Sequence, residues 1–292
     1  MCFSRYIVIL FLAVLSATSW ADLNQGVTAY ESADYTAAIV HFSPLAESGD
    51  PVAQYYLGRM YFLGDGVSQN YNEAAKWYSK SAKQGRPEAQ VGMGTLYVTG
   101  KGVRQDIHEA TNWFLMAAKQ GYADGQFWVG YMYVSCPDHN ICSGDTAIKY
   151  FTKAAEQGHG EAQNNLGAIY ESSPDSADRF IMLAGIKQDY IEAYKWYEIA
   201  AKNGVSEASK NRDELSSKMS ATQISKAKDL ANEWIKQQKT PAPLTGDRDL
   251  STPANSIIGH WVTDDNHHHY FGKPAQKGFR LGSYIHQKPK GK

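Results

Sequence analysis

A block of sequence that recurs four times constrains this chain more than any other feature. Residues 50–85 and 86–121 have the same length and align without a gap. Residues 122–158 repeat the pattern with one extra residue, and residues 159–204 repeat it with ten extra residues. Self-similarity with a period of about 36 residues is typical of repeat proteins, in which each copy is one small structural unit. Such units must stack, because none can bury its apolar face alone.

Each copy has the pattern of two amphipathic helices. In the first half of a copy, apolar residues such as Ala53, Leu57 and Met60 recur at helical spacing, which predicts one apolar face. The second half carries a large aromatic residue on its apolar face, at Trp77, Trp113, Tyr150 and Trp196. A glycine recurs in the middle of the first half, at Gly58, Gly94, Gly130 and Gly167. Glycine inside a helix costs about 1 kcal/mol relative to alanine, so its recurrence predicts a neighbouring helix that passes too close for a Cβ atom.

The recurring pattern resembles the signature of the Sel-one-like repeat (SLR) family, a relative of the tetratricopeptide repeats (TPR). That signature, A-x-x-x-L-G-x-x-Y-x-x-G-x-G-V followed by E-A-x-x-W-Y-x-x-A-A-x-x-G, is readable in all four copies. The first two copies match it best, the third lacks both loop glycines, and the fourth has a lengthened loop. The resemblance covers roughly residues 22–239. It implies an all-α fold, a right-handed α/α superhelical solenoid, that acts as a protein-interaction scaffold.

The sequence also predicts a cap at each end of the array. Residues 22–49 look like a shortened repeat, and residues 205–239 begin like a new first helix. Ser220 and Gln223 have the spacing of a capping box, in which two side chains satisfy backbone amides at a helix start. The predicted organisation is therefore a capping repeat, four full repeats and a C-terminal cap.

The first 21 residues predict an export signal and are set apart from the fold. Arg5 precedes an apolar run over residues 6–17, and Ser19 and Ala21 place small residues where a signal peptidase reads. The alternative is a membrane anchor, but a spanning helix needs roughly 20 apolar residues, and this run has about half of them. We expect cleavage after Ala21 and a periplasmic or secreted mature chain without a transmembrane segment.

Removal of the signal leaves two cysteines, Cys136 and Cys142. An even cysteine count in an exported chain indicates a disulfide, so we expect these residues to be bridged. A zinc site is the alternative, with His139 between the two cysteines as a further ligand. The family resemblance adds that some exported members carry such bridges and that a few bind β-lactam antibiotics. A β-lactam-binding or hydrolase-like protein is therefore an alternative function.

Composition and motifs argue against several other classes of protein. The chain has 292 residues, a formal net charge of -1 and 43% hydrophobic residues. It is therefore neither a strongly basic nucleic-acid-binding protein nor a multi-pass membrane protein. The sequence has no G-x-S-x-G elbow, no phosphate-binding glycine loop and no H-E-x-x-H motif. We expect a protein that is not an enzyme and needs no cofactor.

Residues 240–292 differ in character from the repeats. A linker with several prolines, over about residues 240–256, leads into a segment with little predicted regular structure. The last 20 residues carry six lysine or arginine residues and no acidic residue. A run of three histidines gives a further alternative, a metal-binding protein, because imidazole suits zinc, copper and nickel. Side chains alternate along an extended chain, so His267 and His269 are the two that could cooperate.

First-helix positions that vary from copy to copy are the candidate partner-binding surface. Each copy has such a pair at positions i and i+4, which share one face of a helix. The pairs are Tyr55/Arg59, Val91/Thr95, Phe127/Tyr131 and Asn164/Ala168. First helices line the concave side of solenoids of this type, so the pairs predict one ladder there, with Phe127, Trp128 and Tyr131 at its aromatic centre. The alternative is that these rings pack between neighbouring repeats.

A second candidate contact is the apolar stretch Phe180, Ile181, Met182 and Leu183 in the long loop of the fourth copy. Exposed apolar patches often mark contacts, although this stretch could instead fold back on its own repeat. For either surface, the expected partner of a monomeric chain is another protein or peptide of the cell envelope, and not a nucleic acid.

Overall fold

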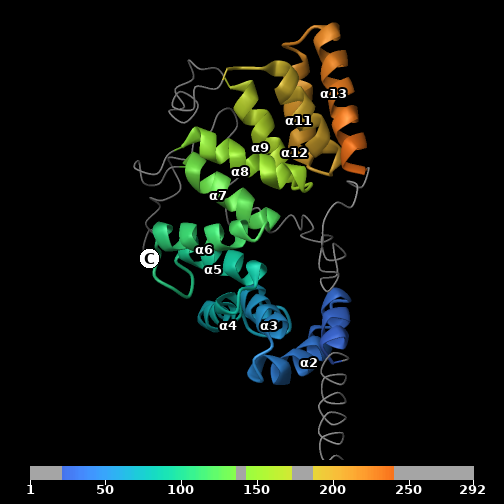
Figure 1. Ribbon diagram of the computed structural model, residues 1–292. Coiled ribbons are helices and arrows are strands. Elements are labelled where there is room, and N and C mark those ends of the chain that lie inside the picture. Colours follow the sequence, from blue (N-terminus) through green and yellow to red (C-terminus); the bar gives the residue numbers. More distant parts are fainter. Residues whose placement is uncertain (1–21, 136–142, 173–186, 240–292) are drawn as a thin grey trace, which may run out of the picture. The chain divides into compact units, whose positions relative to one another are not determined.

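The computed structural model describes residues 22–135, 143–172 and 187–239, and these residues form helices and short connections without a β-strand (Figure 1). Residues 22–31 are helical. The helices that follow are α2 (Tyr35–Glu47), α3 (Pro51–Leu63), α4 (Tyr71–Lys83), α5 (Pro87–Thr99), α6 (Ile107–Lys119), α7 (Ala123–Ser135), α8 (Gly144–Glu156), α9 (Gly160–Glu171), α11 (Tyr190–Lys202), α12 (Ser206–Ser216) and α13 (Ala221–Lys239). The predicted all-α repeat fold is confirmed.

The described residues divide into two compact units. Unit 1 holds residues 22–133 and 146–159, which include most of α7 and α8. Unit 2 holds residues 134–135, 143–145, 160–172 and 187–239. Within unit 1, each helix from α2 to α6 packs against the next along the chain. Within unit 2, α11 packs against α9, α12 and α13. Each unit therefore has the nearest-neighbour packing of a helix-pair solenoid.

Short polar side chains start the helices of the repeats. Asp50 Oδ1 accepts a hydrogen bond from the Ala53 backbone N–H at 2.8 Å at the start of α3. Asn70, Asp106 and Asp189 do the same at the starts of α4, α6 and α11. Each satisfies backbone donors that a helix start leaves without a partner in the helix. At the other end of α3, Gly64 has a φ of 86°, a left-handed conformation that favours glycine.

The mid-helix glycines make room for an aromatic ring of the paired helix. A Cβ atom built on Gly58 would lie 2.5 Å from Cδ1 of Tyr78. The same ideal Cβ would lie 2.4 Å from Phe114 at Gly94, 2.8 Å from Phe151 at Gly130 and 2.5 Å from Tyr197 at Gly167. The prediction of a close approach is confirmed, and the group that approaches is a side-chain ring in each repeat. Each ring is buried, so the packing offsets the lower helix propensity of glycine.

A column of buried amides joins the repeats through hydrogen bonds. Gln54 Nε2 donates to the Ala46 carbonyl at the end of the preceding helix at 3.0 Å. Gln54 Oε1 accepts from Gln84 Nε2, just after the second helix of the same repeat, at 2.8 Å. The equivalent glutamines of the later repeats accept a side-chain hydrogen bond in the same way. Gln90 accepts from Gln120, Gln126 from Gln157, and Gln163 from Asn203. The recurring glutamine thus satisfies groups that burial would otherwise leave without partners.

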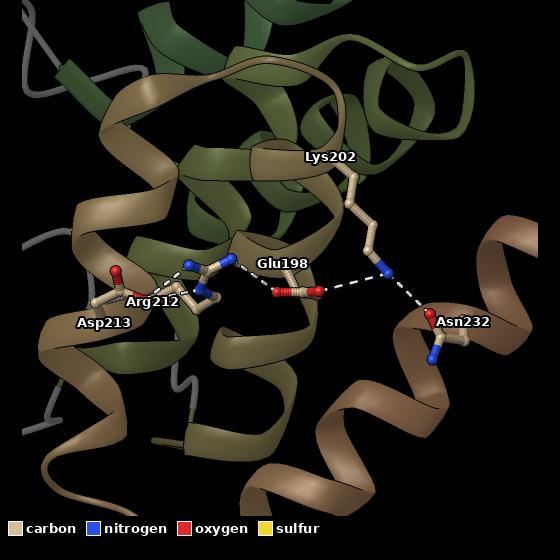
Figure 2. Close-up of polar contacts among 5 residues, drawn as sticks. All are labelled: Glu198, Lys202, Arg212, Asp213 and Asn232. Carbon is tan, nitrogen blue, oxygen red and sulfur yellow. Dashed lines mark hydrogen bonds and ion pairs between the residues drawn. The ribbon is translucent and has the colours of Figure 1, made fainter.

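A polar network joins α11, α12 and α13 at the C-terminal end of unit 2 (Figure 2). Glu198 on α11 pairs with Arg212 on α12 at 3.0 Å and with Lys202 at 3.4 Å. Lys202 Nζ also donates to Asn232 Oδ1 on α13 at 2.8 Å, so the network links α11 to both later helices. Beside it, the rings of Trp196 and Trp234 meet edge to face, 5.6 Å apart. These contacts hold α12 and α13 on α11.

The predicted capping box forms at the start of α13. The Ser220 backbone N–H donates to Gln223 Oε1 at 2.9 Å, and the Gln223 N–H donates to Ser220 Oγ at 3.3 Å. On the inner side of α13, Ala227 and Ala231 are buried. The cap helix therefore begins where the sequence predicted.

Candidate partner-binding surface

The predicted ladder residues fall into both units. Tyr55 and Arg59 lie on α3, and Phe127, Trp128 and Tyr131 lie on α7, all in unit 1. Asn164 lies on α9 in unit 2. One continuous ladder across four repeats therefore stays a prediction.

Tyr55 lies in the apolar interior of unit 1. The residue is 5% exposed, and its ring meets that of Tyr56 edge to face at 5.3 Å. The guanidinium of Arg86 lies over its ring, 5.1 Å from the centroid. Burial raises the pKa of the Tyr55 hydroxyl to about 12. The ring is thus mainly a packing element and has little surface left for a partner.

Arg59 lies half-buried among tyrosines. Its guanidinium is 5.2 Å from the centroid of the Tyr30 ring, a cation–π geometry. Tyr30 donates its hydroxyl to Asp65 Oδ2 at 2.7 Å, and burial raises the pKa of that hydroxyl well above its usual range. Arg59 therefore combines a packed, oriented guanidinium with partial exposure to solvent.

The aromatic centre of the ladder forms a continuous cluster on α7. Phe127 contacts Trp128 and Tyr131, with ring centroids 5.3 and 6.2 Å apart. Trp128 stacks on Phe114 of α6 at 5.4 Å, and Phe127 packs on Phe151 of α8 at 5.9 Å. The three α7 rings are partly exposed. They therefore pack between repeats, as the alternative held, and also keep some outer surface.

The sequence did not predict a second row of side chains, which lies beside the aromatic residues of the ladder. His159 stacks on Phe127 with ring centroids 4.5 Å apart, and its Nε2 is 3.4 Å from Asp124 Oδ1. Tyr122 donates its hydroxyl to the other oxygen of Asp124 at 3.1 Å. One repeat earlier, Arg86 pairs with Glu88 at 3.1 Å. We name Arg86, Glu88, Tyr122, Asp124 and His159 the junction row.

The junction row has a signal in the sequence. Arg86, Tyr122 and His159 each directly follow the glycine that closes a repeat. Their identity changes from copy to copy while that glycine recurs. A variable position beside a recurring one is where a repeat protein can change its partner without changing its fold.

Asn164 takes part in the interior of unit 2. It is 8% exposed, and its Oδ1 accepts a hydrogen bond from Asn211 Nδ2 of α12 at 3.1 Å. This contact fastens α9 to α12 and occupies the side chain that the ladder prediction assigned to a partner.

The other predicted sites lie outside the described residues. They are Cys136 and Cys142, the stretch Phe180 to Leu183, His267 and His269, and the export signal. Within the described ranges, no three His, Cys, Asp or Glu side chains come together in a group that could hold a metal ion. No described helix has both the length and the apolar character needed to cross a membrane.

The stacked helix pairs and their recurring glycine and glutamine contacts define a helix-pair repeat protein, and comparisons with known proteins identify the family. The Sel1 repeat model matches residues 51–85, 87–122, 144–159 and 160–205. The crystal structure of a Sel1 repeat protein from Oxalobacter formigenes is similar, with a TM-score of 0.57 and 28% identity, over 74% of this chain and 81% of that chain. The chain belongs to the Sel1 repeat family.

A second solved structure shares the fold. A protective antigen present in uropathogenic Escherichia coli strains, which displays an SLR fold, is 22% identical, with a TM-score of 0.50, over 81% of this chain and 67% of that chain. No curated protein matches the sequence. Solenoids of this family serve in general as protein-interaction scaffolds without catalytic activity.

Proposed function

We propose that this protein is an interaction scaffold of the bacterial cell envelope, which binds a segment of another protein through unit 1. The binding surface consists of the α7 aromatic cluster and the adjoining junction row. Residues 1–21 support the envelope location, because their apolar run and small residues have the pattern of an export signal.

The observation that carries the proposal is the partly exposed cluster of Phe127, Trp128 and Tyr131 next to the His159–Asp124 pair. Aromatic side chains dominate binding hot spots, because they bury much area at a small cost in side-chain entropy. Here the rings are already held by neighbours on α6 and α8, so binding would order few additional bonds. The adjacent His159–Asp124 contact and the Tyr122 hydroxyl supply polar groups that can orient a partner.

The proposed binding surface is smaller than the ladder predicted from the sequence. Tyr55 and Asn164 are each under 9% exposed and already engaged, so they act as supports in this proposal. Arg59 stays at the edge of the surface as a partly exposed cation. The centre of the proposed binding surface is α7 together with the turn that carries His159.

The test is a comparison of two double variants as bait in quantitative capture from envelope extracts. Tyr131→Ala with His159→Ala removes the proposed centre. Lys76→Ala with Lys149→Ala is the matched control on the outer sides of α4 and α8, where both lysines are exposed. The proposal expects a partner that the unmodified protein and the control retain and the first variant loses. With that partner purified, we expect its Kd to rise at least tenfold for the first variant, which is about 1.4 kcal/mol.

Circular dichroism and thermal unfolding must show that both baits are folded. The proposal is wrong if the folded Tyr131/His159 variant binds the partner as well as the unmodified protein does. It is also wrong if removal of residues 240–292 alone abolishes binding, since the tail would then be the binding element.

A further inference from the structure

The turn between α11 and α12 differs chemically from the equivalent turns of the other repeats. Each repeat ends with an amide residue followed by a glycine. In the first three repeats the amide residue is glutamine, in the pairs Gln84–Gly85, Gln120–Gly121 and Gln157–Gly158. In the fourth repeat it is Asn203, and Asn203–Gly204 is the one place in the sequence where glycine follows asparagine. The asparagine side chain is shorter by one methylene group, which changes the ring that it can form with the main chain.

An asparagine that precedes a glycine can react with its own main chain. The backbone nitrogen of the glycine loses its proton and attacks Cγ of the asparagine, the bond from Cγ to Nδ2 breaks, and the amide leaves as ammonia. The product is a five-membered succinimide. Water adds to either carbonyl carbon of this ring and breaks its bond to nitrogen, which gives aspartate or isoaspartate. Glycine has no Cβ to hinder the attack, and glutamine would have to close a six-membered ring, which forms far more slowly.

The Asn203–Gly204 pair is open to solvent on the surface of unit 2. Both residues are exposed, and a Cβ atom built on Gly204 would have no neighbour within 4 Å. Water and hydroxide therefore reach the atoms that react. Gly204 has a φ of 90°, a left-handed conformation that closes the helix and that glycine adopts readily.

Two hydrogen bonds hold this turn in a form that does not react. Asn203 Nδ2 donates to Gln163 Oε1 at 2.8 Å, which fixes the side chain toward α9. The Gly204 backbone N–H donates to the Ala201 carbonyl at 3.0 Å, so the proton that the nitrogen must lose is engaged. Both bonds must break before the nitrogen and Cγ can meet. The reaction therefore proceeds from a locally opened turn, and its rate depends on how often the turn opens.

Conversion removes the donor that links the turn to α9. The side-chain carboxylate of the product has no N–H for Gln163 Oε1, and Gln163 is fully buried, so this oxygen loses a partner that solvent does not replace. The new negative charge lies at the C-terminal end of α11, where it opposes the helix dipole. The adjacent cation, Lys202, is already held by Glu198 and Asn232 (Figure 2). In isoaspartate, a methylene carbon also enters the main chain between α11 and α12.

We propose that Asn203 is a deamidation site, that it reacts from the opened turn, and that its conversion releases the α11–α12 turn from α9. Converted molecules accumulate with time, because ammonia is lost in the reaction. The site lies in unit 2 and is independent of the binding surface proposed for unit 1. The first three repeats keep the same inter-helix bond with glutamine and are resistant to this reaction.

The first experiment follows deamidation of the full chain by peptide mass spectrometry. The protein is kept at pH 8.5 and 37 °C, folded in buffer and unfolded in guanidinium chloride. Asn232 is the internal control, because it is also an exposed asparagine of unit 2 but is followed by Glu233. The matched variant is Asn203→Gln, which restores the residue of the other repeats. Fragmentation by electron transfer distinguishes isoaspartate from aspartate.

In the folded protein, we expect Asn203 to convert at least fivefold faster than Asn232. In guanidinium chloride the Asn203 rate should rise at least tenfold further, because the turn no longer restrains it. The products should include isoaspartate, which direct hydrolysis of the side-chain amide does not give. Asn203→Gln should show no measurable conversion at position 203.

A second experiment measures the structural consequence by hydrogen exchange. Asn203→Asp carries the product carboxylate without waiting for the reaction. We expect exchange over residues 199–208 to be at least fivefold faster in this variant than in the unmodified protein. In Asn203→Gln it should stay within twofold, because glutamine makes the same bond in the other repeats. Exchange in α4 and α5 of unit 1 should not change in either variant.

Three results would each overturn the proposal. The first is conversion of Asn203 in the folded protein that is no faster than that of Asn232, or that gives no isoaspartate. The second is an Asn203 rate that is the same in the folded and the unfolded chain, since the turn would then not control the reaction. The third is exchange over residues 199–208 that is as slow in Asn203→Asp as in the unmodified protein.

Discussion

The two ends of the described array are held by different physical forces. At the N-terminal end, Phe42 of α2 is fully buried and stacks on Tyr56 of α3 with centroids 4.7 Å apart. Helix 22–31 fits over the same ring, since a Cβ on Gly26 would lie 2.6 Å from Phe42. At the C-terminal end, α12 and α13 contribute smaller buried side chains, such as Ala208, Leu215 and Ala227, and the Glu198 network adds charged contacts to the Trp196–Trp234 ring pair (Figure 2).

This difference indicates how each end responds to change. An aromatic anchor contributes through apolar area and close packing, which salt and pH alter little. A partly buried ion network contributes through charge, and desolvation and salt reduce its net contribution to the free energy of unfolding. The N-terminal end should therefore fail when one ring is removed, and the C-terminal end should weaken in smaller steps.

The largest expected effect is that of Phe42→Ala. Removing a buried phenylalanine costs about 3–5 kcal/mol, because transfer energy is lost and a cavity remains. Gly26 brings helix 22–31 close to this ring, so we expect that helix and α2 to open together. Hydrogen exchange should show faster exchange over residues 22–47 and little change over α12 and α13. Exchange that rises equally at both ends would show that the two ends are not independent.

The second effect concerns Glu198→Gln at the other end. The Glu198 side chain is 12% exposed and faces two cations, Arg212 and Lys202. Neutralising it leaves these cations with Asp213 and Asn232 as partners. We expect a loss of about 1–3 kcal/mol in the local stability of α12 and α13 by hydrogen exchange. The loss should shrink at 0.5 M NaCl, whereas that of Phe42→Ala should not.

The matched control for Glu198 is Glu207→Gln. The Glu207 side chain is 51% exposed and lies 3.5 Å from Lys210, so the pair contributes under about 0.5 kcal/mol. If both variants cost the same, the network is no more than a set of surface pairs, and the contrast between the two ends is lost.

A third, smaller effect tests the start of the cap helix. Ser220→Ala removes the side chain that accepts from the Gln223 N–H, and loss of an N-cap costs about 1 kcal/mol. Hydrogen exchange should show more fraying in the first turn of α13. Ser225→Ala, at an exposed position within the same helix, should have no such effect. Equal fraying in both variants would mean that the capping box does not hold this end.

The sequence predicted those features that follow from local spacing. The mid-helix glycines and the Ser220–Gln223 capping box depend on neighbours within a few residues or on a column that recurs. The Glu198 network could not be predicted in this way, because Asn232 lies 30 residues from Lys202. Repetition reveals contacts that every copy makes, and this network exists at one end only.

The candidate surface was predicted only in part for a related reason. An i, i+4 pair shows that two side chains share a helix face, but not how deeply neighbours cover that face. Tyr55 and Asn164 follow the ladder pattern and are nevertheless buried. His159 departs from the pattern and lies against Phe127, because the turn between two repeats brings it there.

The smallest expected effect exchanges the residues that end two equivalent helices. Glu47 ends α2 and Lys83 ends α4, and both are exposed. Glu47→Lys should raise the local stability of α2 by about 0.3–1 kcal/mol, because a cation suits the last turn of a helix. Lys83→Glu should lower that of α4 by a similar amount. Hydrogen exchange of each helix measures both changes, and Glu47→Gln should lie between the two charged forms. If Glu47→Lys instead weakens α2, the carboxylate stabilises its own helix, and the helix dipole does not decide the stability of this end.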